Sequence, residues 1–396
     1  MALTIENIRG RVGDLDSHES IPVPRYGQVF GPIGKRLADE NDEFWAVSNA
    51  VAKFKGEPEH EWLTSDREDN LEITEEVVWT VRGTAAPGSV DMGRRAAVMD
   101  TMGIQRQLIF PMMGIVAWIQ AHGGNQAVFP PASAEQQEIG KQAIDAYNDW
   151  AGKLTRQNKD RMWVVGMIAS GLPGMTPELM TQKAQDLIDK GCRAILISSG
   201  LPPGGVAPGD TRLDPFYALL AKNNTTLTFH PPSGMGYRAS EIWESKVLNP
   251  MYAIVTVQHI AEENFIAAMI LSGVFDRHPT LRVAVVEAGA SWIGPLADRM
   301  DDLMGMKPDH SNLSMLPSKF LSRNVRSSII GDEPVDLYIK QWPHLQDVYC
   351  YSSDYPHIEG GQWSLKKSFA RVAPLGDEIV EKFFVTNSRL VLPDAA

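Results

Sequence analysis

The sequence is short of cysteine, of long apolar runs and of positive charge. Only Cys192 and Cys350 occur in 396 residues, too few for a disulfide framework, and neither belongs to a Cys-x-x-Cys motif. Both stand in or beside apolar runs, so we expect buried structural thiols. No run approaches the ~18 apolar residues of a transmembrane helix. Lys and Arg number 37 against 49 Asp and Glu, and this net charge of -12 argues against a nucleic-acid-binding surface.

What is present is typical of a globular enzyme. Hydrophobic residues make up 43% and charged residues 22%, which allows a sizeable buried core. The polar first residues, 1–14, lack the apolar segment of a signal peptide, so we expect a cytoplasmic protein. We also expect a small-molecule substrate, with no nucleic-acid partner and no membrane.

Eight short apolar runs alternate with longer segments of helical periodicity. Such runs between helices are typical of buried parallel strands. Eight of them predict an α/β fold, a closed (β/α)8 TIM barrel. The strands are expected at 12–18, 107–110, 162–168, 194–198, 226–230, 283–287, 325–330 and 348–354, and the clearest helices at 134–157, 177–190, 214–222 and 251–272.

Residues 25–90 do not fit this alternation. They hold charged clusters and Trp45, Trp62 and Trp79, without a strand period. We interpret them as a long insertion after strand one that contains helices, because a structureless loop of this length is uncommon in a compact domain. The chain 1–396 is then a single barrel domain, with 25–90 as a lid over its mouth.

Polar residues end several of the predicted strands, and barrel enzymes place their chemistry at the C-terminal strand ends. Asp16 and His18 end strand one, and their side chains share a face because strand side chains alternate. His230, Glu287 and Asp354 end strands five, six and eight. Two histidines and two carboxylates suit one divalent ion, Zn²⁺ first and Mn²⁺ or Fe²⁺ next. The expected ligands are Asp16, His18, His230 and Asp354.

Each of these positions also has a plainer interpretation. Asp14 and Asp16 could be turn residues, and His230 could be a hydrogen-bonded polar residue at a strand end. Asp354 precedes Tyr355-Pro356 and could cap a turn. The four metal positions together, each at a predicted strand end, favour the metal site.

Several short segments resemble one family. They are Asp-Leu-Asp-Ser-His at 14–18, Phe-His-Pro-Pro at 229–232, Glu-Ala-Gly-Ala-Ser-Trp-Ile at 287–293 and Ser-Asp-Tyr-Pro-His at 353–357. They resemble motifs of the amidohydrolase-related family that includes aminocarboxymuconate-semialdehyde decarboxylase. The resemblance runs from about residue 12 to 392, except 25–90. It implies a (β/α)8 barrel, often a homodimer, with one divalent ion bound by Asp16, His18, His230 and Asp354.

Two positions depart from the decarboxylases of that family. The resemblance leads us to expect His-x-His on strand one, where Asp16 stands first, and a histidine acid/base near the end of strand six, where Glu287 stands. The first change favours a harder ion. The second removes the usual proton shuttle, so hydrolysis becomes the leading hypothesis.

We therefore predict a metal-dependent hydrolase acting on a small aromatic or cyclic substrate. A bound ion lowers the pKa of its water to near ~7. Asp354 is the expected catalytic base. Glu287 is a second acid/base group or a support for a ligand, unless it is a buried structural carboxylate. The alternative is a metal-dependent non-oxidative decarboxylase, a carboxy-lyase in which Asp354 or Glu287 manages the proton. A third hypothesis is a non-catalytic binding barrel.

Four further residues are candidates for substrate binding. Arg212 and Arg238 are on predicted mouth loops, where they could bind a carboxylate or remain solvated. His357 could reach the mouth or lie on the surface. Trp292 could line a flat apolar site, although an aromatic residue there could equally pack against the insertion.

Overall fold

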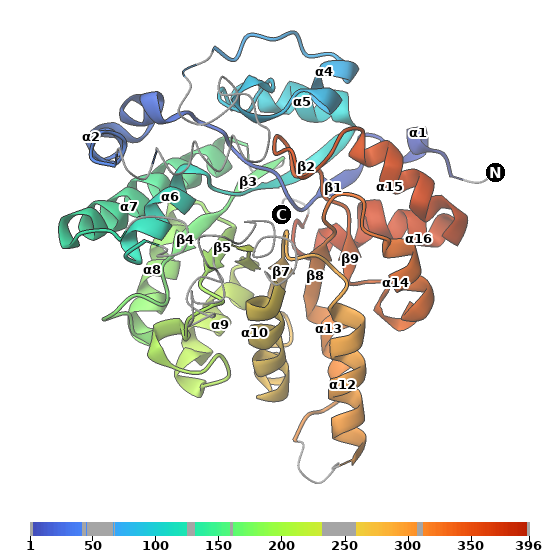
Figure 1. The fold of residues 1–396 in the computed structure, drawn as a ribbon. Coiled ribbons are helices and arrows are strands. Elements are labelled where there is room, and N and C mark those ends of the chain that lie inside the picture. Colours follow the sequence, from blue (N-terminus) through green and yellow to red (C-terminus); the bar gives the residue numbers. More distant parts are fainter. Residues whose placement is uncertain are drawn as a thin grey trace, which may run out of the picture.

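The fold is a ring of parallel strands surrounded by helices (Figure 1). It is seen in a computed structural model that describes residues 3–41, 45, 66, 68–124, 131–158, 161–231, 259–306 and 312–393. The strands are β1 Val12–Asp14, β2 Ile104–Ile109, β3 Met162–Val164, β4 Gly166–Ile168, β5 Ala194–Ile197, β6 Thr226–Phe229, β7 Arg282–Val285, β8 Val325–Ser328 and β9 Tyr349–Cys350. They pair in parallel in the orders β1-β2-β3 and β4-β5-β6-β7-β8-β9.

The (β/α)8 barrel predicted from the sequence is confirmed, and each of its eight strands is found. The third is split at Val165 into β3, which pairs with β2, and β4, which pairs with β5. Past β1 and β9 the chain continues the pairing. The Leu15 N–H donates to the Tyr351 carbonyl at 3.2 Å, and the His18 N–H donates to the Tyr355 carbonyl at 2.7 Å. These bonds join the first strand to the last and close the ring.

The helices between the strands begin and end beside the capping residues that the sequence contains. α7 begins after a capping box formed by Ser133 and Gln136. α8 begins with Pro177 and ends at Lys190, and the next residue, Gly191, caps it with a φ of 103° that suits glycine. The helices are α1 Ile5–Ile8, α2 Tyr26–Asp39, α4 Glu75–Thr80, α5 Arg95–Met102, α6 Met113–Ala121, α7 Ala134–Gln157, α8 Pro177–Lys190, α9 Asp214–Lys222, α10 His259–Leu271, α11 Val274–Arg277, α12 Ile293–Met306, α13 Pro317–Asn324, α14 Val335–Gln341, α15 Ser364–Val372 and α16 Asp377–Glu381. The predicted bounds of α7, α8 and α9 are confirmed, and α10 falls inside the predicted segment 251–272, of which 251–258 lies outside the described residues.

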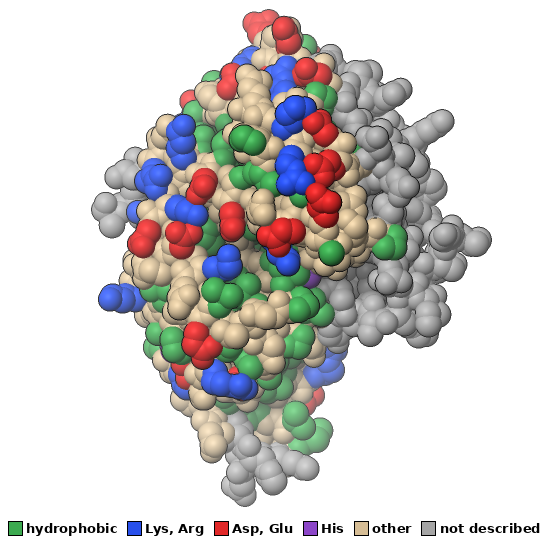
Figure 2. All heavy atoms as spheres, turned by 90° about the vertical axis from the view of Figure 1, so that its left-hand side faces the viewer, with side chains coloured by type: hydrophobic (Ala, Val, Ile, Leu, Met, Phe, Trp, Pro, Cys, Tyr) green, Lys and Arg blue, Asp and Glu red, His purple; other side chains and the backbone are tan. Residues whose placement is uncertain are grey.

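The core is apolar, and most strand positions are fully buried. Cys192 and Cys350 are buried and unpaired, as predicted. None of the helices in the described ranges has the length and apolar character needed to cross a bilayer. On the face that carries α7 and α8, acidic and basic side chains are interspersed, so that face presents no continuous positive surface (Figure 2).

The insertion after β1 contributes α2 and α4. Phe30 of α2 lies 5.5 Å from the Trp150 ring of α7, so this helix packs beside the barrel. At the other end of the insertion, the Gly83 N–H donates to the Pro356 carbonyl at 2.8 Å, next to the C-terminal end of the last strand. Residues 42–44, 46–65 and 67 lie outside the described part, and the role of lid remains a prediction.

Candidate metal centre

Six ionisable side chains meet at the C-terminal ends of the barrel strands. Parallel strands in a closed ring bring these ends together, although the residues are far apart in the sequence. The six are Asp16 and His18 after β1, His230 after β6, Glu287 after β7, and Asp354 and His357 after β9. The sequence named all six as site residues, four of them as metal ligands.

Three carboxylates approach one imidazole. The His18 Nε2 atom lies 3.3 Å from Asp16 Oδ1, 3.4 Å from Asp354 Oδ1 and 3.7 Å from Glu287 Oε2. His18 and Asp16 are fully buried, and Asp354 is 5% exposed. So much negative charge in a buried place requires protons or a cation.

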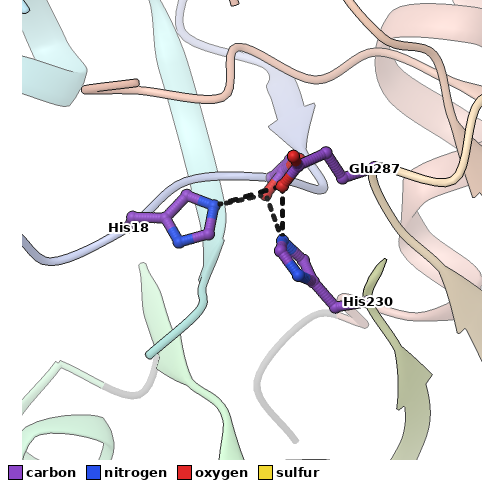
Figure 3. A group of neighbouring side chains, drawn as sticks. His18, His230 and Glu287 are labelled. Atoms are coloured by element: carbon purple, nitrogen blue, oxygen red, sulfur yellow. Dashed lines mark ion pairs between the residues drawn. The ribbon is translucent and has the colours of Figure 1, made fainter. Parts of the chain in front are cut away.

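His230 faces the same point from across the barrel. Its Nε2 atom lies 2.7 Å from Glu287 Oε2 (Figure 3). The same atom lies 3.9 Å from Asp16 Oδ1. The ring of Phe110, at the end of β2, stacks on the His230 ring with centroids 4.7 Å apart. Phe110 is fully buried and supports the histidine from behind. This role could not be predicted from the sequence, because Phe110 is only the last residue of an apolar run.

His357 belongs to the cluster and not to the outer surface. Its ring stacks on that of His18 with centroids 3.8 Å apart and an interplanar angle of 23°. Its Nδ1 atom lies 3.2 Å from Asp354 Oδ1, while 20% of its side chain remains exposed. This histidine therefore lies between the buried centre and solvent. A role in substrate binding remains a prediction.

The backbone is strained at two of these residues. Glu287 and Asp354 have φ values of 58° and 50°, in the left-handed region that residues other than glycine seldom adopt. Gly360 lies against the second of these turns, where a Cβ atom would come within 2.1 Å of the Ser353 carbonyl oxygen. Only glycine fits there, so the chain approaches closely enough to hold the Asp354 turn in place.

Asp14 ties the first strand to the last. Its Oδ1 accepts from the Ser353 N–H at 2.8 Å, and its Oδ2 accepts from Ser353 Oγ at 2.6 Å and from Gln107 Nε2 at 2.8 Å. Burial raises the pKa of Asp14 to about 6, although these bonds act in the opposite direction. Asp14 thus positions the turns that carry Asp16 and Asp354. Sequence reasoning left it as a turn residue, since its donors come from distant strands.

Two buried charged residues hold the chain beyond His18. Glu19 accepts backbone N–H bonds from Ile21, Met112 and Met113, at 3.0, 2.7 and 2.9 Å, and so fixes the start of α6. Arg95 donates to the His18 carbonyl and, at 2.8 Å, to the Gly88 carbonyl. Neither was predicted from the sequence. Glu19 directly follows His18, but nothing local distinguishes it from an exposed carboxylate.

The electrostatics of the cluster show a shortage of positive charge. Burial and the neighbouring Asp354 raise the pKa of Asp16 well above its ordinary value. Burial alone would lower the pKa of His18, but the three carboxylates around it raise the pKa well above the usual value. Burial lowers the pKa of His230. Burial would raise the pKa of Glu287, but His230 and His18 lower it well below the usual range. Protonation of His18 and of Asp16 thus reduces the net negative charge of the cluster.

The donor atoms fit a divalent ion. Within the part of the chain that the structure describes, Asp16 Oδ1, both nitrogens of His18 and both Asp354 carboxylate oxygens are buried without a hydrogen-bond partner. Two overlapping groups have ligand atoms within 4.8 Å of one another. They are Asp16, His18, His230 and Glu287, and His18, Glu287, Asp354 and His357. Carboxylate oxygen and imidazole nitrogen are the ligands of Zn²⁺, Mn²⁺ and Fe²⁺.

The other predicted binding residues lie elsewhere. The Arg212 side chain is 63% exposed and is held by Asp210 at 2.7 Å. Trp292 is 4% exposed, packs in the core and donates from Nε1 to the Gly289 carbonyl at 2.8 Å. Arg238 lies outside the described residues. The substrate-binding roles of all three stay predictions.

Comparison with known proteins gives the same family that the motifs resemble. A sequence model of the amidohydrolase family matches residues 120–393. No curated protein sequence matches the chain. An amidohydrolase structure from Mycobacterium avium subsp. paratuberculosis is 18% identical, with a TM-score of 0.67 over 96% of this chain and 99% of that chain.

Two decarboxylases share the fold. The 5-carboxyvanillate decarboxylase of Novosphingobium aromaticivorans, solved with manganese and 4-hydroxy-3-methoxy-5-nitrobenzoic acid, is 18% identical, with a TM-score of 0.59 over 96% of each chain. The 2,6-dihydroxybenzoate decarboxylase of Rhizobium is 16% identical, with a TM-score of 0.55 over 96% of this chain and 98% of that chain. At such identities these structures establish the fold alone. The sequence match covers more than half of the residues, and the chain therefore belongs to the amidohydrolase family of metal-dependent enzymes.

Proposed function

We propose that this enzyme is a divalent-metal-dependent decarboxylase that acts on a hydroxylated aromatic acid. The observation that carries the proposal is the buried cluster of carboxylates and imidazoles, in a fold that also serves 5-carboxyvanillate and 2,6-dihydroxybenzoate decarboxylases. Our preference for hydrolysis rested on Glu287 standing where a histidine was expected. Glu287 lies inside the cluster, 2.7 Å from His230, so an ionisable group does occupy that place.

The reaction needs no oxidant. The ring carbon that bears the carboxylate accepts a proton, the bond to the carboxylate breaks, and its electron pair restores the ring as carbon dioxide leaves. A hydroxyl group ortho or para to that carbon supplies electron density for the protonation. A bound divalent ion would hold substrate oxygen atoms and offset their negative charge.

The chain's own residues divide this work. Asp16, His18, His230 and Asp354 are the proposed ligands. We assign the proton to Asp354, because neither of its oxygens has a hydrogen-bond partner in the described residues. Glu287, paired with His230, orients that ligand. Phe110 keeps water from the inner side of His230.

The donor set favours Mn²⁺ over the Zn²⁺ expected from the sequence. Carboxylate oxygens suit harder ions, and three carboxylates face this centre. Manganese is also the ion in the Novosphingobium decarboxylase structure.

Hydrolysis is the second candidate, since the Asp354 carboxylate, which has no hydrogen-bond partner among the described residues, would also serve as base toward water. A substrate panel separates the two reactions. Chelated protein reloaded with Mn²⁺ is incubated with 2-hydroxybenzoates and 4-hydroxybenzoates, and in parallel with aryl esters, lactones and amides. Loss of the carboxylate from a hydroxybenzoate supports the proposal. Turnover of the esters, lactones or amides alone would replace it by hydrolysis.

A further inference from the structure

A carboxylate outside the cluster holds the turn that carries Glu287. Glu333 lies on the loop after β8 and is partly buried. Both of its oxygens accept from the Ala290 N–H at 3.1 Å, and Oε2 also accepts from the Ile330 N–H at 2.9 Å. The Tyr338 hydroxyl of α14 donates to Oε1 at 3.4 Å. Glu333 thus joins the turn after β7 to the loop after β8.

The turn at 287–290 is strained and needs such a restraint. Glu287 and Gly289 have φ values of 58° and 68°, both in the left-handed region. A residue other than glycine keeps this conformation only when its surroundings over-determine it. A Cβ atom on Gly289 would lie 3.3 Å from Glu333 Oε1, so the carboxylate packs directly against the turn.

Two other bonds to this turn come from uncharged groups. The Glu287 N–H donates to Ser328 Oγ at 3.0 Å, and Trp292 Nε1 donates to the Gly289 carbonyl at 2.8 Å. Burial raises the pKa of Glu333, but the backbone N–H groups that donate to it favour the ionised form. A hydrogen bond to an ionised acceptor is roughly twice as strong as one between neutral groups. Glu333 is therefore the strongest of these restraints.

Glu287 in turn reaches the histidines of the centre. Its Oε2 atom lies 2.7 Å from His230 Nε2 and 3.7 Å from His18 Nε2. Under the proposed function, on which this inference rests, Glu287 orients the ligand His230. The Cα–Cβ bond of Glu287 takes its direction from the backbone of the turn, so a relaxed turn would aim the carboxylate away from His230.

We propose that Glu333 is a positioning residue for Glu287. It fixes the left-handed turn after β7 and so aims the Glu287 carboxylate at His230. This role could not be predicted from the sequence, because 43 residues separate Glu333 from Ala290, whose N–H it accepts.

A double-substitution cycle on Mn²⁺ affinity tests this inference. Chelated protein is titrated with Mn²⁺ in the absence of substrate, and the free ion is measured by its electron paramagnetic resonance signal. Loss of a group that orients a metal ligand typically weakens metal binding by ~10–100-fold, and we expect a loss of that order in both Glu287→Ala and Glu333→Ala. The double variant should bind Mn²⁺ within about twofold of Glu287→Ala, because Glu333 acts only through Glu287.

Two further variants make the cycle decisive. Glu333→Gln keeps one acceptor oxygen, so it should recover part of the affinity, and it carries the same cycle if Glu333→Ala does not fold. Asp301→Ala is the matched control. Asp301 of α12 also accepts a backbone N–H, that of Ser318 at 2.9 Å, but this bond holds the start of α13 and not the turn. The control should be less stable in urea and should keep the wild-type affinity for Mn²⁺.

Near-wild-type affinity in a folded Glu333→Ala protein would overturn the inference. A double variant whose loss equals the product of the two single losses would also overturn it, since Glu333 would then act on the fold and not through Glu287. The cycle is separate from the reaction. A coupled loss in a protein that decarboxylates no hydroxybenzoate would keep the role of Glu333 and remove the proposed function, whereas additive losses in an active decarboxylase would do the reverse.

Discussion

His18 Nε2 and Asp354 Oδ1 lie 3.4 Å apart across the seam where the barrel closes. One residue follows the first strand and the other follows the last. Neither can be moved without disturbing the backbone bonds that join those strands. The backbone bonds that close the barrel therefore also bring these two side chains together.

Removal of the His230 imidazole should make the protein lose most of its bound metal. His230→Ala deletes a buried imidazole that faces Glu287 and Asp16, and we expect the variant to fold because the apolar core is unchanged. Metal content after dialysis and the circular dichroism spectrum measure the two effects. His278→Ala is the matched control, since His278 pairs with Asp214 outside the cluster and should keep the ion. Full metal content in His230→Ala would exclude His230 as a ligand.

Asp354→Asn should damage chemistry more than binding. The amide keeps the shape and one acceptor oxygen but cannot carry the proton. Acid/base catalysis is worth roughly 10²–10⁴-fold, so kcat should fall by about that factor, while the affinity for a nitro analogue of the substrate changes much less. Glu287→Gln is the companion variant. A comparable loss of kcat there, with near-normal turnover in Asp354→Asn, would move the proton to Glu287.

Asp14→Ala should destabilise the protein. The substitution leaves the buried Ser353 and Gln107 donors without their acceptor. Three donors lose their acceptor and each unsatisfied group costs ~1–3 kcal/mol, so the free energy of unfolding should fall by at least about 3 kcal/mol. Urea unfolding measures the loss, and Gln107→Ala, which removes one of these bonds, should cost less. A loss below ~1 kcal/mol would mean that the hydrogen bonds to Asp14 do not stabilise the fold.

The two cysteines should be unreactive in the native protein. Burial raises the pKa of both Cys192 and Cys350 from 9.0 to about 12. A thiol-exchange reagent should label neither residue until the chain is unfolded, when both react. Rapid labelling of the native protein would contradict their burial.

The raised pKa values of the two thiols also make the free energy of unfolding depend on pH. Between pH 9 and about 12 the folded protein keeps thiol protons that the unfolded chain releases. The thiols therefore contribute stability below pH 9 and lose it as the pH rises toward 12. Urea unfolding of Cys192→Ala and Cys350→Ala should show a shallower decline across this range than the wild type. Equal slopes would contradict the assigned shifts.

Much of the fold and the centre could be predicted because their signals are local. An apolar run ending in a charged residue marks a strand end, and this placed His230, Glu287 and Asp354 correctly. Capping residues defined α7 and α8. The break at Val165 could not be seen, because both halves are equally apolar and only the pairing partners differ.

The contacts that support the site residues could not be predicted from the sequence, for a similar reason. The acceptor role of Asp14 and the stacking of Phe110 on His230 depend on residues from distant strands. The preference for hydrolysis relied on the missing histidine at position 287. A position in the sequence does not reveal that Glu287, after β7, and His357, after β9, both face the centre.

Labelled carbon dioxide is the most direct measurement of the central claim. A 2-hydroxybenzoate carrying ¹³C in its carboxylate is given to the chelated protein and to the same protein reloaded with Mn²⁺, and the headspace is analysed by mass spectrometry. The account predicts ¹³CO₂ from the reloaded wild type, none from the chelated protein, and strongly reduced release from reloaded Asp354→Asn. Release that is equal in the chelated and reloaded wild-type protein would contradict a metal-dependent decarboxylase.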